Sequence, residues 1–299
     1  MSKFHTKHEQ PSERVHVFYI GFGLNDNGEE SQKKTRFYDE LFNDIPTFAF
    51  GPRKVEDKQK EWGIWPTVRE AAQMIYSIPE IQEAAKEYLD CVNTEDKYIR
   101  RGEFGELILY HLLHEYFGAE ALISKIYFKD SRGQAPHGFD AVHVDSMNEI
   151  LWLGESKLYK DGKRAIDELA KDLTDHFNNS FFDNEFSIIT NRASDDNAEL
   201  SEFMQRLIDP KIDPIDKLPN INIALFAGFD SDCLKNYNSQ EFREKLDDEI
   251  DILYNRASMK SGSHAWNKRL NLYLFLFPLD DKRKFVSDLH QKLKAAQQI

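Results

Sequence analysis

The sequence predicts an α/β protein in which helices flank a mixed central sheet. Short apolar runs rich in β-branched and aromatic residues indicate strands, and longer segments with apolar residues three or four apart indicate amphipathic helices. From residue 101 to residue 190 these patterns follow the order helix, three strands, helix, strand. Strands that alternate with helices are typical of a sheet with both faces covered, so we expect one composite body.

The N-terminal third is expected to contain both kinds of element. Residues 1–14 are polar and predict a frayed tail. After this tail the pattern predicts a strand over 16–23, a helix over 35–42 that closes at Ile45-Pro46, a short strand over 47–50, and two helices over 66–77 and 79–89.

The pattern becomes denser after residue 96. Residues 101–117 predict an amphipathic helix that Gly118 ends. Strands are then predicted over 122–128, 138–144 and 150–157, followed by a helix over 164–178 and a strand over 186–190. The remainder predicts helices over 199–208, 240–254 and 282–295, with strands over 221–226 and 270–277.

Composition and charge limit the possible functions. The 299 residues are 40% hydrophobic and 30% charged, which is typical of a globular protein, and the net charge of −13 counts against a free-standing nucleic-acid binder. Two cysteines, Cys91 and Cys233, are too few for a disulfide framework or a Cys-rich zinc site. Residues 1–14 lack the apolar core of a signal peptide, and the apolar run 270–279 is shorter than the ~20 residues that cross a bilayer. We therefore expect a cytoplasmic protein.

Three charged residues on two neighbouring predicted strands form the candidate site. Asp140 lies on one strand, and Glu155 and Lys157 lie on the next, two apart and therefore on the same face. Mg²⁺ prefers oxygen ligands, and one or two carboxylates with a substrate phosphate suffice for it, with Mn²⁺ as a possible replacement. We expect Asp140 and Glu155 to bind the metal, with the backbone carbonyl of Ser156 as a further ligand. Lys157 would then orient the attacking water or stabilise charge on the phosphate.

A structural interpretation competes with this one. Glu-x-Lys is a frequent pattern in a chain with 30% charged residues, and Glu155 and Lys157 could simply form an ion pair. On the preceding helix, Glu106 is preferred to Glu103 as an additional carboxylate because it lies deeper in the apolar stretch. The alternative is that both glutamates are solvated helix charges.

Other polar residues carry weaker predictions. His111 and His114 are expected to be structural, because no Cys or carboxylate stands near them at zinc-finger spacing. His137 either touches substrate or ends a loop. Lys160, Lys163 and Arg164 open a helix, where they either contact phosphate or are solvated. The sequence has no P-loop, G-x-G-x-x-G fingerprint or nucleophile triad pattern.

The order of elements over residues 101–190, with Asp on the second strand and Glu-x-Lys on the third, resembles the PD-(D/E)xK (restriction-endonuclease-like) nuclease superfamily. By this resemblance Asp140 matches the Asp of the motif, Glu155 its acidic residue, Lys157 its Lys, and Glu106 (or Glu103) the Glu on the first helix. Phe139 stands where the motif has Pro, and no clear Gln-x-x-x-Tyr follows, which argues against the RecB-like subgroup.

A narrower resemblance covers most of the chain. The runs HGFDAVHV and LWLGESKLYKDG, with IWPTVREAAQMIY upstream, are similar to the HamA family, the nuclease subunits of the Hachiman anti-phage defence system. This resemblance implies a prokaryotic cytoplasmic nuclease that works with a superfamily 2 helicase, HamB, which would supply DNA binding and ATP hydrolysis. We expect the chain to consist of an N-terminal α/β elaboration over 1–95, a PD-(D/E)xK-like core over 96–215, and a C-terminal α/β extension over 216–299 packed on the same body.

The sequence and its resemblances together predict a Mg²⁺-dependent endo- or exodeoxyribonuclease that acts as a defence effector. Asp140 and Glu155 would bind the metal, Lys157 would position or activate the water, and Glu106 would assist. The alternative is a catalytically inactive subunit that docks on or regulates a helicase, because no catalytic motif explains residues 1–95 or 200–299. RNA is a third interpretation of the substrate, since a metal site of this kind contacts phosphate and has no preference for either sugar.

Overall fold

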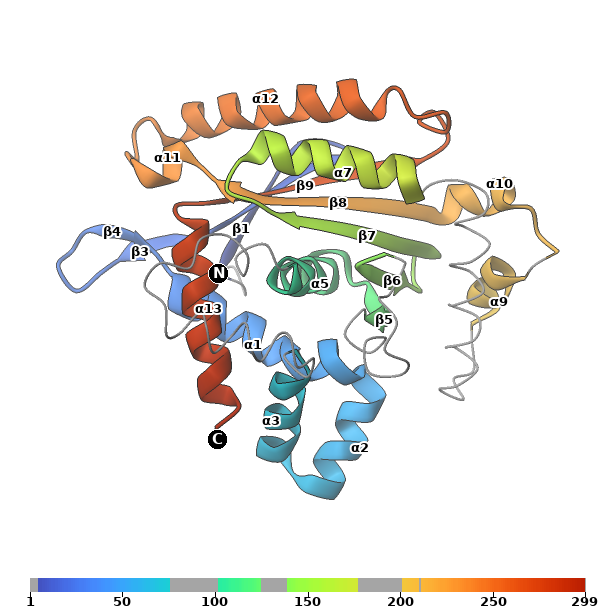
Figure 1. Cartoon of the computed structure of the whole chain (residues 1–299), viewed down its shortest axis with the longest axis horizontal. Helices are drawn as coiled ribbons and strands as arrows, with labels where there is room; N and C mark the ends of the chain where they lie inside the picture. The colour runs from blue at the N-terminus through green and yellow to red at the C-terminus, as the bar shows by residue number, and fades with distance from the viewer. Residues whose placement is uncertain (1–4, 76–101, 125–138, 177–200, 210, 299) are drawn as a thin grey trace.

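One mixed sheet organises the protein. The computed structural model describes residues 5–75, 102–124, 139–176, 201–209 and 211–298. Seven strands form the sheet in the order β1-β2-β9-β8-β7-β6-β5 (Figure 1). They are β1 (Thr6–Ser12), β2 (Val15–Ile20), β5 (Glu120–Ser124), β6 (Ala141–Asp145), β7 (Ile150–Leu158), β8 (Ile221–Asp230) and β9 (Asn271–Leu279). A separate antiparallel pair consists of β3 (Phe22–Leu24) and β4 (Glu30–Gln32).

The centre of the sheet is parallel. β2 pairs with β9, β9 with β8, and β8 with β7 in parallel, whereas the outer strands β1, β6 and β5 pair antiparallel with their neighbours. In register, Glu155 of β7 lies beside Leu225 of β8, and Leu225 lies beside Leu274 of β9. The carboxyl ends of β7, β8 and β9 therefore share one edge of the sheet, which we call the carboxyl edge.

Helices cover both faces of the sheet, as the sequence predicted. Above the sheet in Figure 1 lie α7 (Gly162–His176) and α12 (Phe242–Ser261), and below it lie α1 (Lys34–Phe50), α5 (Glu103–Phe117) and α13 (Lys282–Ala296). The remaining helices are α2 (Pro52–Trp62), α3 (Ile64–Ile75), α9 (Glu202–Ile208), α10 (Pro214–Lys217), the 3₁₀ turn η1 (Leu218–Asn220) and α11 (Asp232–Lys235). A mixed α/β fold with a flanked central sheet is thus confirmed.

Alternation along the strands divides the interior into two cores. On β8, Ala224 and Phe226 pack with α5 and α13, whereas Ile223 and Leu225 pack with α7 and α12. Successive residues of a strand point to opposite faces, so a strand covered on both faces is apolar throughout. We refer to the two sides as the α5 face and the α7 face.

Two predictions for the N-terminal third were wrong. The expected frayed tail contains β1, which pairs antiparallel with β2 from Thr6 to Ser12, so its polar sequence is held by backbone pairing. The expected strand over 47–50 is helical, because α1 continues through Pro46 to Phe50. Its buried residues Phe37, Leu41, Ile45 and Phe48 recur every three or four positions, and this apolar stripe outweighs the local proline.

The later elements agree better with the sequence. α5 ends at Phe117 and Gly118 follows with a left-handed φ of 60°, as expected for a helix stop. The charged segment over residues 54–60 lies within the helix α2. The predicted helix over 79–89, the predicted strand over 186–190 and His137 lie outside the described residues. Among the helices that the structure describes, none is both long and apolar enough to span a membrane.

Candidate functional site

Asp140 is fixed at the point where β6 begins. Its backbone N–H donates to the carbonyl oxygen of Gly154 on β7 at 2.9 Å. Its carboxylate Oδ2 accepts hydrogen bonds from the backbone N–H of Ser156 at 2.9 Å and from the Ser156 hydroxyl at 3.0 Å. Asp140 is 6% exposed and Ser156 is 4% exposed, so this pair of bonds is buried. The carboxylate is therefore oriented by β7 and not by solvent.

Glu155 and Lys157 point to the opposite face from Ser156. Trp152 and Leu158 belong to the core on the α5 face, whereas Leu153 belongs to the core on the α7 face. By alternation, Glu155 and Lys157 share the α7 face with Leu153. Glu155 is 2% exposed, and an ionised carboxylate at such a depth requires a partner or a metal.

Lys157 contacts Asp172, a residue that sequence reasoning missed. Its Nζ forms an ion pair with Oδ2 of Asp172 on α7, and the two side chains are 22% and 18% exposed. Burial alone would lower the pKa of Lys157, but the hydrogen bond and charge of Asp172, followed by the charges of Glu155 and Asp140, outweigh burial and raise the pKa. Lys157 is therefore protonated at neutral pH, and the charges of Glu155 and Asp140 both act on its ammonium group.

Two glycines allow α5 to approach β7 closely. A Cβ on Gly105 would lie 3.3 Å from Oγ of Ser156, and a Cβ on Gly154 would lie 2.7 Å from Cδ2 of Leu109 and 3.1 Å from Cβ of Ala141. Helix and strand thus meet where the Ser156 hydroxyl holds Asp140. Because neither glycine has a side chain, α5 and β7 can pack this closely beside Asp140.

The same contacts define the position of Glu106. α5 contacts Ser156 at Gly105 and Gly154 at Leu109, so it runs antiparallel to β7. Since β6 is also antiparallel to β7, α5 runs parallel to β6. One turn after Glu106, the ring of Tyr110 packs against His143 of β6 at a centroid distance of 5.1 Å. Glu106 therefore lies near the start of β6, on the α5 face. It is 5% exposed, whereas Glu103 is half-buried, so Glu106 is not a solvated helix charge.

The donor atoms around Asp140 fit a hard divalent cation. A residue in a strand directs its N–H and C=O to the same side, so the Ser156 carbonyl points toward the side where its N–H binds Asp140. Carboxylates of Asp140 and Glu155 with this carbonyl make an all-oxygen set, which Mg²⁺ prefers. No group of three or more His, Cys, Asp or Glu side chains at metal-binding distance occurs in the part of the chain that the structure describes. Two carboxylates with a carbonyl and waters are nevertheless sufficient for Mg²⁺.

The other predicted residues have separate positions. His111 is buried and its Nδ1 lies 2.7 Å from Oδ2 of Asp44 on α1, which agrees with the expected structural role. His114 on the same helix stacks with Tyr110 at 6.2 Å. Lys160, Lys163 and Arg164 are exposed where β7 leads into α7.

A pattern in the sequence of α7 could have indicated Asp172. Leu169 and Leu173 are buried, and Asp172 stands at the border of the apolar stripe that they define. A carboxylate that borders the apolar stripe of the helix after Glu-x-Lys is a candidate partner for the lysine. The sequence does not show which side of that stripe faces the lysine on β7.

The sheet with two covered faces and the carboxylates beside a lysine at its edge define the class: an α/β protein with a nuclease-like fold. The chain belongs to the HamA family, whose model matches residues 2–293, so the resemblance drawn from the motifs is confirmed. Membership of this family implies a role in Hachiman anti-phage defence. Comparison with curated proteins gave no match.

Proposed function

We propose that this HamA-family protein is a metal-dependent DNA nuclease that acts as the effector of a defence complex. One observation supports the proposal most: Asp140 and Glu155 are buried carboxylates, 6% and 2% exposed, and both act electrostatically on the ammonium group of Lys157. Buried carboxylates beside an ammonium at the end of a strand suit phosphodiester hydrolysis, because the reaction concentrates negative charge on the phosphate.

Each side chain has a distinct task in this proposal. Asp140, Glu155 and the Ser156 carbonyl would hold Mg²⁺ or Mn²⁺, which supplies a polarised phosphoryl oxygen and an activated water. Ser156 orients Asp140 through its N–H and hydroxyl. Lys157, whose pKa is raised chiefly by Asp172 against the effect of burial, would stabilise charge on the phosphate and position or activate the water. Glu106 would assist from the α5 face.

A DNA-binding partner would compensate for the acidic charge of the chain. A net charge of −13 predicts weak intrinsic binding to DNA, because affinity for the DNA backbone comes from Lys and Arg that neutralise phosphates. A superfamily 2 helicase of the HamB type would bring DNA to the site and hydrolyse ATP. This part of the proposal rests on membership of the HamA family.

The test is a DNA cleavage assay with the helicase complex, in the presence and absence of ATP and Mg²⁺. Glu155→Gln and Lys157→Met should each reduce cleavage by about 100-fold or more, because loss of one electrostatic contributor has that effect in many enzymes. The matched control is Glu13→Gln, an exposed residue between β1 and β2, at the far end of the sheet from β7, and this change should leave cleavage unchanged. Melting temperature and co-purification with the helicase show that the variants are folded and assembled.

Two outcomes would contradict the proposal. Wild-type cleavage rates in Glu155→Gln or Lys157→Met would remove these residues from the chemistry. Phage protection that survives Asp140→Ala would identify the chain as a regulatory subunit of the helicase complex without catalytic activity.

A further inference from the structure

The carboxyl edge of the sheet continues directly from the candidate site. Three residues after Lys157, the carbonyl of Lys160 accepts a hydrogen bond from the N–H of Asp230 at 3.1 Å. The N–H of Ser231 in turn donates to the carbonyl of Leu279 at 2.7 Å. These bonds join the ends of β7, β8 and β9 in one row, with α7, α11 and α13 beginning at it.

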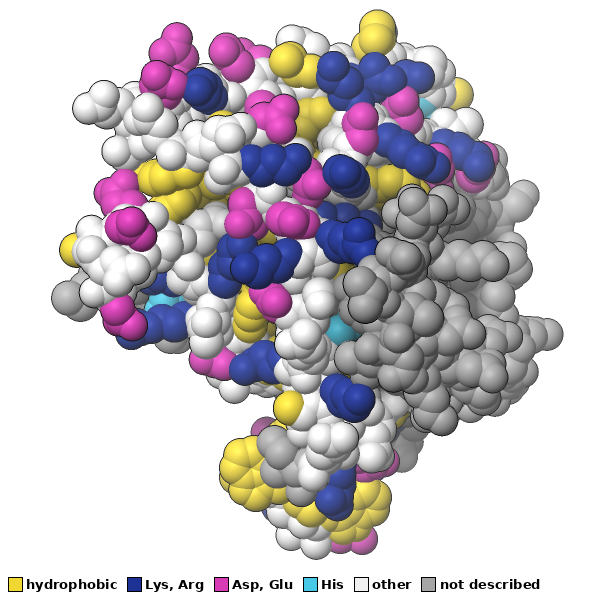
Figure 2. All heavy atoms as spheres, turned by 60° about the vertical axis from the view of Figure 1, so that its left-hand side comes forward, with side chains coloured by type: hydrophobic (Ala, Val, Ile, Leu, Met, Phe, Trp, Pro, Cys, Tyr) yellow, Lys and Arg dark blue, Asp and Glu magenta, His cyan; other side chains and the backbone are white. Residues whose placement is uncertain are grey.

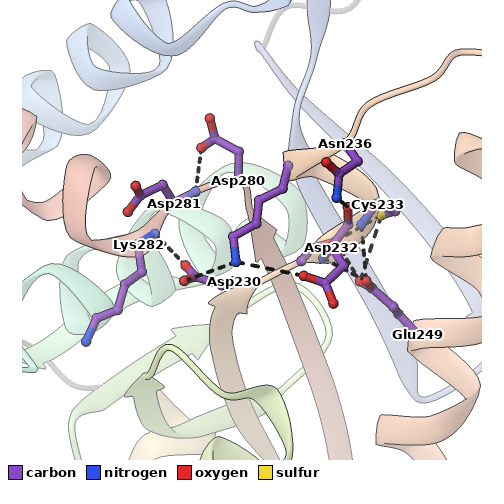
Figure 3. Close-up of polar contacts among 10 residues, drawn as sticks. Asp230, Asp232, Cys233, Asn236, Glu249, Asp280, Asp281 and Lys282 are labelled. Atoms are coloured by element: carbon purple, nitrogen blue, oxygen red, sulfur yellow. Dashed lines mark hydrogen bonds and ion pairs between the residues drawn. The ribbon is translucent and has the colours of Figure 1, made fainter.

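Three carboxylates along this row bind groups within the fold, whereas Asp161 and Asp232 are exposed. Asp230 accepts the backbone N–H of Lys282, and its side chain is only 8% exposed. Asp281 caps α13 by accepting the N–H of Lys284 at 3.0 Å. Asp280 accepts a hydrogen bond from Nζ of Lys34 at 2.6 Å, which ties the start of α1 to the same row. Figure 3 shows Asp230, Asp280, Asp281 and Lys282 close together at this point.

Several basic side chains along the row have no ion-pair partner among the described residues. Six exposed basic residues follow the strand ends or begin the neighbouring helices, and none of them forms an ion pair within the described part of the chain. They are Lys33, Lys160, Lys163, Arg164, Arg283 and Lys284, and we call them the edge cations. Figure 2 shows the face that includes this side of the molecule, with many Lys and Arg side chains among the carboxylates.

The chemistry of the edge cations favours a polyanion over other partners. Residues 159–164 and 280–284, which carry five of the six, contain none of the exposed large apolar side chains found among the described residues. Protein interfaces depend on aromatic or aliphatic anchors, and membrane surfaces on inserted apolar side chains. Exposed Lys and Arg in segments that lack exposed large apolar side chains instead suit phosphates, whose contacts position a nucleic acid without reading its sequence.

We propose that the edge cations bind the sugar–phosphate backbone of a DNA strand and guide it along the carboxyl edge to Asp140, Glu155 and Lys157. The inference deepens the proposed function and rests on it for the identity of the substrate. It also reconciles a net charge of −13 with a nucleic-acid substrate, because the six edge cations are exposed beside the candidate site.

The test compares two triple variants of equal charge in the full-length chain. The edge variant is Lys160→Gln, Lys163→Gln and Arg283→Gln. The control variant is Lys211→Gln, Lys268→Gln and Arg269→Gln, which are exposed residues that precede β8 and β9 at the opposite edge of the sheet. Both variants carry the Glu155→Gln change, so that bound DNA is not cleaved, and Glu155→Gln alone is the parent. Melting curves monitor folding.

Binding of single-stranded DNA, duplex DNA and RNA oligonucleotides is measured by fluorescence anisotropy over a series of NaCl concentrations. Each phosphate contact contributes about 0.7–0.9 to the slope of log K against log salt. The edge variant should therefore lose about 2–3 from the slope for DNA and bind at least about tenfold more weakly at low salt. The control variant should bind within about twofold of the parent.

Several results would overturn the inference. The edge and control variants could lose affinity equally, the parent could fail to bind DNA at low salt, or it could bind anionic lipid vesicles but no DNA. Equal or tighter binding of RNA would assign the edge to RNA. The same experiments separate this inference from the proposed function. If DNA binding depends on the edge cations but the wild-type complex does not cleave DNA, the DNA-binding surface stands and the nuclease assignment is wrong.

Discussion

The ion pair between Lys157 and Asp172 gives a quantitative test of how the site is held. Exposed ion pairs contribute about 0–1 kcal/mol, and removing one partner of a fully buried pair costs about 3–5 kcal/mol. With side chains 22% and 18% exposed, this pair lies between these limits. We expect Asp172→Asn to lower the free energy of unfolding by about 2 kcal/mol, because the ammonium of Lys157 stays largely buried without its carboxylate.

A double-mutant cycle measures the coupling directly. Urea unfolding at pH 7 of the wild type, Asp172→Asn, Lys157→Met and the double variant should give a coupling free energy of about 1–2 kcal/mol, with Asp172→Glu recovering part of the loss. The pKa of Lys157 is raised, so the stabilisation is complete below the ordinary lysine pKa and is lost as the pH rises through the raised value. Additivity within about 0.3 kcal/mol would refute the coupling.

Three further predictions concern the surroundings of the site. Burial, opposed in part by the hydrogen bond to the Ala119 carbonyl, lowers the pKa of His143 to about 4. Between about pH 6.5 and 4 only the unfolded state binds this proton, so the free energy of unfolding falls by about 1.4 kcal/mol per pH unit; His143→Gln should remove that slope from pH-dependent urea unfolding. Gly154→Ala should cost about 1–3 kcal/mol because its Cβ would meet Leu109 at 2.7 Å, and Leu109→Ala should restore part of the loss in the same assay. Ser156→Ala removes one of two hydrogen bonds to Asp140, so cleavage should slow about tenfold while the melting temperature shifts by only a few degrees, and unchanged cleavage would show that the hydroxyl does not orient the carboxylate.

The predicted strands at the site could be placed from the sequence because strand alternation is a local property. Glu155 and Lys157 share a face for the same reason that Ser156 faces away from it. The hydrogen bonds from Ser156 to the Asp140 carboxylate were not predicted, because they depend on the exact point where β6 stops pairing with β7. The sequence indicated Ser156 as a source of a carbonyl but not as a donor to Asp140.

Contacts between distant parts of the chain were beyond local patterns. β1 is polar and contains a proline, so it has weak strand character and is stabilised by pairing with β2. The place of Asp172 depends on how α7 is rotated above the sheet, which its amphipathic pattern fixes only approximately. The order of the strands was equally hidden, because β2 and β9 are separated by most of the sequence.

The parallel pairing of β2 with β9 has a consequence for how the protein is made. β2 leaves the ribosome well before its partner β9, which spans Asn271–Leu279. Contacts between segments so far apart in sequence form slowly, and the central strand β8 also needs β9 on one side. A chain interrupted before residue 271 therefore lacks the strand that joins β1 and β2 to the rest of the sheet. Synthesis itself therefore delays completion of the sheet on which the candidate site rests.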